Sequence, residues 1–414
     1  MYIYRNIEAK IWKHINRKEY TIIVGARQTG KTTLLHRLFT KLKKQNQRVF
    51  YLSFENLDIL QSIDEHPENI FKYAIRPQEP HSKDESNAPI IIFIDEIQYA
   101  ANPSNFLKYL YDKYLANLKI VATGSSAFYI DHAFNDSLAG RKRLFILRSL
   151  SFDEYLRFNN LNALHDELLL IRQQSDYISS LFREMLEVFN EYLVFGGYPA
   201  VALEKEKEEK ILLLKDLKNS FLKKDIDESG ISNRDAFLKL FMLLSEQVGN
   251  LLNKNELSNT IGVDNKTIDS YLNVLMKSFH IELIKPFSTN LRKELIKMPK
   301  VFLLDNGMRN SMLNRFSDFD HRADRGALLE NYVFTRLAEV FEVENIRFWR
   351  TTDKKEVDFV VSADFKTGQA FEVKISASLK KSSGLYKFRE LYPDITIDLL
   401  TYEFSDSSLQ VLKV

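Results

Sequence analysis

Residues 25–32 read Gly25-Ala-Arg-Gln-Thr-Gly-Lys-Thr32, a pattern typical of loops that bind phosphate groups. The apolar residues 21–24 before it favour a buried strand, and the residues from Thr33 onward favour an amphipathic helix. Glycines let the backbone curl so that its N–H groups point at phosphate oxygens beside a helix N-terminus. The sequence therefore predicts an ATP-binding loop made by Gly25, Ala26, Arg27, Gln28, Thr29, Gly30, Lys31, Thr32 and Thr33. Lys31 is expected to reach the β- and γ-phosphates, and the Thr32 hydroxyl to bind Mg²⁺.

A second motif supports the first. Residues 90–96 read Ile90-Ile-Ile-Phe-Ile-Asp-Glu96, so Asp95 is expected at the carboxyl end of a buried strand, where such sheets bind their ligands. We predict that Asp95 helps to hold Mg²⁺. Glu96 is then placed to orient or deprotonate an attacking water as a catalytic base. The alternative is that these two acidic residues only begin a helix, where they favour the helix dipole.

The composition limits the class of protein. With 414 residues the chain is long enough for about three domains. A content of 45% hydrophobic and 28% charged residues indicates a globular protein, and a net charge of +2 gives no global argument for nucleic acid. There are no cysteines, which excludes disulfides and thiolate zinc sites. The longest apolar run, residues 90–94, is too short to cross a membrane, so we expect a cytoplasmic protein without a membrane partner.

Alternating strand-like and helix-like segments in residues 6–156 predict an α/β domain with a parallel sheet. The expected strands are 21–24, 48–54, 90–94, 119–123 and 143–147, and the proline-rich stretch 76–89 is expected to be a surface loop. Thr123-Gly-Ser-Ser126 follows the fourth strand. The Ser125 hydroxyl could contact the γ-phosphate or the water as a sensor, although serine is also an ordinary turn residue.

These motifs resemble a family. The loop, Asp95-Glu-Ile-Gln98, Thr123-Gly-Ser-Ser126 and Leu138-Ala-Gly-Arg141 are similar to those of prokaryotic AAA-type P-loop ATPases that continue with a helical region, a winged helix and the C-terminal domain of unknown function 4143. Residues 195–199 and 221–225 resemble the next landmarks of that group. The resemblance implies a homo-oligomer in which Arg141 acts as an arginine finger on a neighbour's nucleotide. Arg141 could instead be one more surface cation, since Lys142 and Arg143 follow it.

The resulting organisation has four parts: an AAA-type ATP-binding domain (1–156), a helical lid-like region (157–235), a winged helix (236–318) and a nuclease-like domain (319–414). In the third part, residues 255–261 and 265–278 predict a helix-turn-helix, because Gly262 can end the first helix and Asp264 can cap the second. Strands at 281–286 and 300–304 are expected to flank a basic wing at 287–297. This arrangement favours DNA binding, but winged helices also serve as protein-binding modules.

The C-terminal part carries a second possible active site. Glu330 lies on an apolar-striped helix, and two strand-like segments, Glu356–Val361 and Phe371–Ile375, contain Asp358, Glu372 and Lys374. Carboxylates can bind Mg²⁺, while a nearby lysine polarises water or stabilises a phosphate. The pattern resembles the PD-(D/E)XK nuclease-like fold, with Val357 in place of the proline. It implies metal binding by Glu330, Asp358 and Glu372 and a catalytic Lys374. Chance pairing of Glu and Lys on a strand, or a fold that persists without turnover, is the alternative.

Together these patterns predict an oligomeric ATPase with ATP and Mg²⁺ as cofactors, which acts on DNA as a motor or an ATP-gated nuclease. The competing hypothesis is a nucleotide-dependent switch or scaffold whose winged helix and nuclease-like domain bind protein partners.

Overall fold

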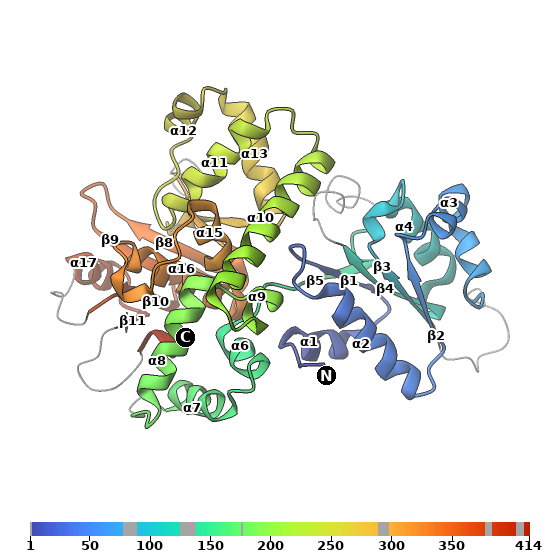
Figure 1. Ribbon diagram of the computed structural model, residues 1–414, viewed down its shortest axis with the longest axis horizontal. Coiled ribbons are helices and arrows are strands. Elements are labelled where there is room, and N and C mark those ends of the chain that lie inside the picture. Colours follow the sequence, from blue (N-terminus) through green and yellow to red (C-terminus); the bar gives the residue numbers. More distant parts are fainter. Residues whose placement is uncertain are drawn as a thin grey trace. The chain divides into compact units, whose positions relative to one another are not determined.

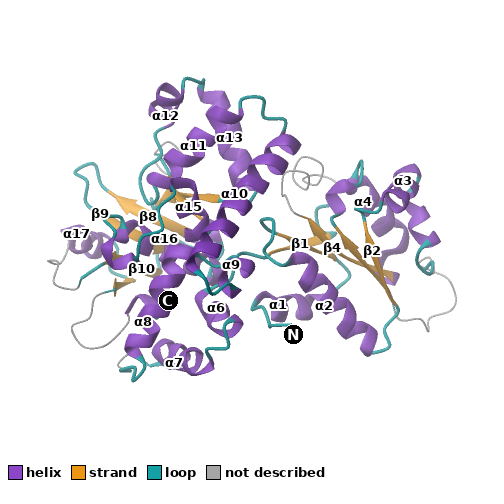
Figure 2. Ribbon diagram, in the orientation of Figure 1, coloured by secondary structure: helices purple, strands orange, loops and turns teal. Residues whose placement is uncertain are grey.

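The computed structural model describes residues 2–77, 89–124, 138–174, 177–288, 298–376, 383–402 and 410–414. The chain divides into two compact units, shown in Figures 1 and 2. The first contains Met1–Arg148 together with Lys277–Phe279, and the second contains Ser149–Met276 together with His280–Val414.

The first unit is built on a five-stranded parallel sheet. Its strands are β1 (Tyr20–Val24), β2 (Val49–Ser53), β3 (Ile90–Asp95), β4 (Leu118–Gly124) and β5 (Lys142–Ile146), in the order β2-β3-β4-β1-β5. All four pairings are parallel. The predicted α/β class and parallel sheet are therefore confirmed, and each predicted strand overlaps an observed one.

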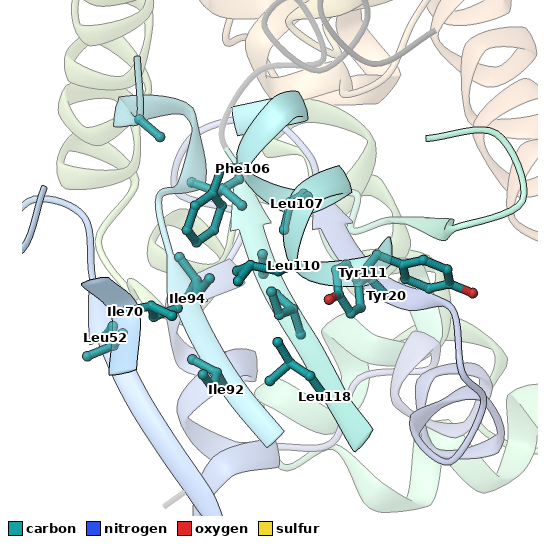
Figure 3. Close-up of a cluster of buried hydrophobic side chains, with 14 of the residues drawn as sticks. Tyr20, Leu52, Ile70, Ile92, Ile94, Phe106, Leu107, Leu110, Tyr111 and Leu118 are labelled. Carbon is teal, nitrogen blue, oxygen red and sulfur yellow. The ribbon is translucent and has the colours of Figure 1, made fainter. Parts of the chain in front are cut away.

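Helices cover both faces of this sheet because the central strands are apolar on both faces. Side chains alternate along a strand, so Ile22 and Ile92 join one core cluster while Ile23 and Phe93 join the other. The first cluster packs against η1 (Pro67–Lys72) and α4 (Pro103–Tyr114), as Figure 3 shows for part of it. The second packs against α1 (Ile7–Ile15) and α2 (Lys31–Lys44). The remaining elements are α3 (Leu57–Glu65), η2 (Ile97–Tyr99) and η3 (Leu115–Asn117).

The second unit begins with helices, as the sequence predicts. The helices at its start are α6 (Phe152–Phe158), α7 (Asn162–Gln173), α8 (Phe182–Phe195), α9 (Pro199–Leu203), α10 (Lys207–Ser229), α11 (Arg234–Glu246), α12 (Lys254–Ile261) and α13 (Asn265–Lys277). Three more helices lie between or after the strands of this unit: α15 (Asn306–Leu313), α16 (Arg325–Val340) and α17 (Ser383–Leu391). Its short turns are η4 (Phe319–His321), η5 (Val343–Asn345) and η6 (Gln410–Leu412). The α12–α13 pair matches the expected helix-turn-helix. Gly262 ends α12 with a φ of 80°, and Asp264 accepts a hydrogen bond from the Thr267 N–H at 2.6 Å.

A six-stranded mixed sheet forms the rest of this unit. Its strands are β6 (Ile281–Pro286), β7 (Lys300–Leu303), β8 (Ile346–Arg350), β9 (Glu356–Val361), β10 (Gly368–Lys374) and β11 (Ile395–Thr401), in the order β11-β10-β9-β8-β6-β7. Strands β6 and β7 are the ones expected beside the wing, most of which (289–297) lies outside the described residues. Because β6 pairs with β8 in parallel, one sheet spans the predicted boundary at residue 318. The four-part division stays a prediction.

A buried histidine makes this unit sensitive to acid. His280 lies just before β6, and its ring packs 3.9 Å from the Phe221 ring and 5.5 Å from the Phe241 ring, measured between centroids. Burial lowers the pKa of His280 from 6.5 to about 3, since the apolar surroundings disfavour the imidazolium. Below pH 6.5 the unfolded chain takes up a proton that the folded chain does not, so acid favours unfolding.

We predict that His280→Leu removes this part of the acid sensitivity. Between pH 7 and pH 5, the wild-type free energy of unfolding should fall by about 2 kcal/mol more than that of the variant. Urea unfolding followed by circular dichroism at the two pH values measures the difference. His321→Gln, at an exposed histidine, is the control and should keep the wild-type dependence. Equal pH dependence of wild type and His280→Leu would show that His280 is not buried as a neutral ring.

Candidate functional site

The predicted phosphate-binding loop joins β1 to α2. Its backbone has positive φ angles at Gln28 (61°) and Gly30 (95°), and Gly30 is the N-cap of α2. A backbone whose φ angles alternate between negative and positive values turns successive N–H groups toward one side and makes a concave site for an anion. Lys31 is buried, and its Nζ donates hydrogen bonds to the carbonyls of Gly25 at 3.0 Å and Ala26 at 2.9 Å.

Two contacts fix the loop against the end of β5. A Cβ added at Gly25 would lie 2.1 Å from the carbonyl oxygen of Leu147, so only glycine permits this approach. Arg5, which precedes α1, donates from Nη1 to the Thr29 carbonyl at 2.9 Å and from Nη2 to the Arg148 carbonyl at 2.7 Å. The role of Arg5 could not be predicted from sequence, because it lies 24 residues before Thr29 and belongs to no motif.

Asp95 lies at the end of β3, as predicted, and its carboxylate collects hydroxyl groups from three other elements. Oδ1 accepts from Thr32 Oγ1 at 3.2 Å and also from Thr123 Oγ1 of β4. Oδ2 accepts from the hydroxyl of Tyr51 in β2 at 3.1 Å, and burial together with Asp95 raises the pKa of Tyr51. A threonine hydroxyl beside a carboxylate is a ligand pair that suits Mg²⁺. The structure thus brings Thr32 and Asp95 together, and it adds Tyr51 and Thr123, which position Asp95.

Glu96 adopts a left-handed conformation with φ of 56°, which turns the chain away from the strand. Its N–H donates to Thr123 Oγ1 at 3.1 Å, and its carboxylate accepts a hydrogen bond from the Gln98 amide. The turn η2 does follow Glu96, but the Glu96 side chain makes no capping hydrogen bond to it. Ser125 lies outside the described residues.

Arg141 lies at the edge of the sheet opposite to the loop. It directly precedes β5, and its carbonyl accepts from the N–H of Tyr20 at the start of β1, whereas the loop follows the end of β1. Its Nε is 2.6 Å from Oδ1 of Asp112, and its Nη2 is 3.3 Å from Oδ2. Within one chain the structure therefore does not bring Arg141 to the predicted site.

The predicted carboxylates of the second unit do lie together. Strands β9 and β10 pair antiparallel, as the hairpin at Gly368 requires, and the Val373 N–H donates to Asp358 Oδ2 at 2.8 Å. Lys374 Nζ lies 2.8 Å from Glu372 Oε1 and 4.0 Å from Asp358 Oδ2. Glu330 reaches the same region from α16.

A lysine that the sequence did not single out completes this charged cluster. Nζ of Lys300, at the start of β7, lies 3.1 Å from Glu330 Oε1 and 2.5 Å from Glu356 Oε1. Glu356 also pairs with Arg350. Lys300 was visible only as a charged residue at the start of an apolar strand, Lys-Val-Phe-Leu, and its partners lie 30 and 56 residues further along the chain.

Burial dominates the electrostatics of the cluster. It raises the pKa of Glu330 to about 8 against the attraction of Lys300, and it raises the pKa of Glu372 to about 7 together with the charge of Asp358. Burial also raises the pKa of Asp358, against Lys300 and Lys374. In the described part of the chain no three His, Cys, Asp or Glu side chains form a group that could hold a metal ion. Metal binding by Glu330, Asp358 and Glu372 stays a prediction.

Comparison with family models matches three segments of the chain. Residues 17–156 match an AAA domain, residues 186–318 a domain of unknown function (DUF8612), and residues 325–407 a domain of unknown function (DUF4143). The resemblance drawn from the motifs is thereby confirmed for its AAA-type and DUF4143 parts. The winged helix and the nuclease-like fold stay predictions.

Similar proteins span nearly the whole chain. An uncharacterized protein of Haemophilus influenzae is 26% identical over 92% of this chain and 89% of its own length. The uncharacterized protein MJ1544 of Methanocaldococcus jannaschii is 27% identical over 88% of this chain and 76% of its own length. Among solved structures, the ADP form of the Aeropyrum pernix ORC2 protein is 12% identical, covers 77% of this chain and 97% of that chain, and has a TM-score of 0.35. So low a score does not establish a common overall fold. Among the described residues, no helix has the length and apolar character needed to cross a membrane.

Proposed function

We propose that the chain binds Mg-ATP at residues 25–33 and hydrolyses it. The observation that carries this proposal is the convergence of Thr32 and Thr123 on the carboxylate of Asp95 beside the loop. A hydroxyl from the first turn of a helix and a carboxylate from the end of a neighbouring strand are the donors that Mg²⁺ of a bound nucleotide requires. The AAA-domain match over residues 17–156 supports the same conclusion.

Each residue of the loop region has a distinct task in this proposal. Lys31 exchanges its two carbonyl partners for phosphate oxygens, which gains an interaction between full charges. Thr32 and Asp95 hold Mg²⁺, which neutralises charge on the phosphates. Glu96 orients and deprotonates the attacking water, and its hydrogen bond from Gln98 has to open or rotate for that step. Ser125 is proposed as a sensor of the γ-phosphate.

We further propose that hydrolysis requires a homo-oligomer. Arg141 lies at the sheet edge opposite to its own loop, so it can complete a site only in a neighbouring chain. A guanidinium there would neutralise charge that grows on the transferred phosphoryl group. Its ion pair with Asp112 is partly exposed, which makes it weak and easy to exchange.

Action on DNA is the leading hypothesis for the second unit. The exposed side of α13 carries Asn265, Lys266, Asp269 and Ser270, polar groups of the kind that contact bases and phosphates. Asp269 pairs with Lys254 at 2.5 Å, so the charge of this face is nearly balanced. The same balance favours the alternative, in which the chain is a nucleotide-dependent switch or scaffold and this helix pair binds a protein.

The first prediction separates binding from hydrolysis. Lys31→Ala should lose nucleotide binding because the phosphates lose their charge partner, whereas Glu96→Gln should bind ATP and hardly hydrolyse it. Binding of a fluorescent ATP analogue and release of phosphate measure the two steps. Glu55→Gln, an exposed carboxylate after β2, is the matched control and should behave like wild type. Wild-type turnover by Glu96→Gln would show that another group is the base.

The second prediction concerns Arg141. Arg141→Ala should keep its affinity for ATP but lose turnover on the ~10³-fold scale of arginine fingers. Mixing it with Lys31→Ala should restore part of the activity, because some interfaces then combine an intact loop with an intact arginine. Arg143→Ala, an exposed neighbour, is the control and should retain turnover. A protein that stays monomeric at every concentration with ATP bound would contradict this role.

The third prediction decides between DNA and protein partners. If the second unit acts on DNA, ATP turnover should rise when single-stranded, duplex or branched DNA is added, and binding should weaken steeply with salt because Lys and Arg side chains displace counterions. Lys266→Ala should reduce the stimulation without changing turnover in the absence of DNA. No binding and no stimulation by any of the three forms would favour the switch or scaffold.

A further inference from the structure

The charged cluster of the second unit contains a buried ammonium in contact with carboxylates from two other elements. Lys300 is only 2% exposed, and buried lysines are rare unless they are paired. Its Nζ bridges Glu330 of α16 and Glu356 of β9. A compact positive charge between two carboxylates has the position and the charge of a bound cation.

Glu330 is also closely packed. A Cβ added at Gly249 would come within 2.9 Å of Glu330 Oε2 and 3.1 Å of its Oε1. The N–H of Gly249 is fixed by the carbonyl of Val301 at 2.9 Å, next to Lys300 in β7. Glu330 is therefore held between the Gly249 backbone and the Lys300 ammonium.

In the part of the cluster around Lys374, the two oxygens of Glu372 differ in their hydrogen bonding. Lys374 pairs with Glu372 through Oε1, but Glu372 Oε2 is buried and has no hydrogen-bond partner among the described residues. Four acidic side chains (Glu330, Glu356, Asp358 and Glu372) lie beside three basic ones (Lys300, Lys374 and Arg350). The two lysines reach all four acidic groups: Lys300 pairs with Glu330 and Glu356, whereas Lys374 pairs with Glu372 and lies 4.0 Å from Asp358.

We propose that Lys300 is the resident cation of this cluster and keeps divalent metal ions out of it. A second cation of charge +2 beside a buried ammonium would be strongly repelled, because charges interact strongly where water is excluded. Removing the ammonium leaves Glu330 without its ion-pair partner and leaves Glu356 paired with Arg350 alone, and carboxylate oxygens are the ligands that Mg²⁺ and Mn²⁺ bind. The cluster is then a metal site only in a chain that lacks Lys300, in contrast to the metal site predicted from Glu330, Asp358 and Glu372.

The charged cluster is assembled from two different segments of the chain. Lys300 belongs to the segment that matches DUF8612, whereas its partners Glu330 and Glu356 belong to the segment that matches DUF4143. The C-terminal segment by itself would lack both the ammonium and strands β6 and β7. Experiments on the cluster therefore require the full chain.

The test is titration with Mn²⁺ in the absence of nucleotide, in full-length protein that carries Asp95→Asn to weaken metal binding at the other site. Isothermal titration calorimetry should find no Mn²⁺ at the cluster when Lys300 is present. Lys300→Met, which keeps the length of the side chain without its charge, should bind one Mn²⁺ per chain. Adding Glu330→Gln to Lys300→Met should weaken that binding by at least about tenfold, since a carboxylate oxygen beside the vacated position is lost. Lys300→Arg keeps the charge and should again exclude Mn²⁺.

Stability gives a readout that does not depend on any activity. Lys300→Met should unfold at a lower temperature than the parent because Glu330 loses its ion-pair partner and Glu356 keeps only Arg350, and Mn²⁺ should raise its midpoint while leaving the parent unchanged. Lys300→Gln, which still hydrogen-bonds both carboxylates, serves if Lys300→Met does not fold. The proposal would be overturned if the parent bound Mn²⁺ and Glu372→Gln abolished this binding. So would a folded Lys300→Met or Lys300→Gln that binds no Mn²⁺. Neither result depends on ATP hydrolysis, so this test can fail while the proposed ATPase function stands.

Discussion

The buried carboxylate of Asp95 is the point on which the first unit depends. A buried charge is tolerated only where several donors compensate for the lost water, and here the donors come from α2, β2 and β4. Because β2 and β4 both pair with β3 in parallel, their carboxyl ends meet at one edge of the sheet. The hydrogen bonds therefore fix the first turn of α2, which begins with Lys31, relative to the strands that surround it.

Local patterns were enough to predict the five strands and the loop of this unit. The apolar runs of β1, β3 and β4 indicate strands because a strand buried on both faces contains little else, and the glycines of the loop indicate the turn between β1 and α2. Residues that act across the fold could not be predicted in this way. Arg5, Tyr51 and Lys300 reach partners far along the chain, and the pattern around each is that of an ordinary segment.

The second sheet shows the same limit at the level of domains. The strands predicted at 281–286 and 300–304 correspond to β6 (281–286) and β7 (300–303), because their length and apolar content are those of strands. Their neighbours in the sheet could not be predicted, since pairing between β6 and β8 depends on 59 intervening residues that have to pack first. Lys300 enters the carboxylate cluster only because of that pairing. A boundary drawn from motifs alone separates residues that share one core.

Lys31 and Lys300, the lysines at the two candidate sites, differ in the partners that each would lose by moving. Lys31 donates to carbonyl groups of its own loop, which are neutral, so a phosphate is a stronger partner for it. Lys300 bridges two half-buried carboxyl groups, and moving it away would remove the ion-pair partner of Glu330 and one of the two partners of Glu356. The first lysine is thus arranged to receive an anion. The second is arranged to stay where it is, which makes it part of the structure of its site.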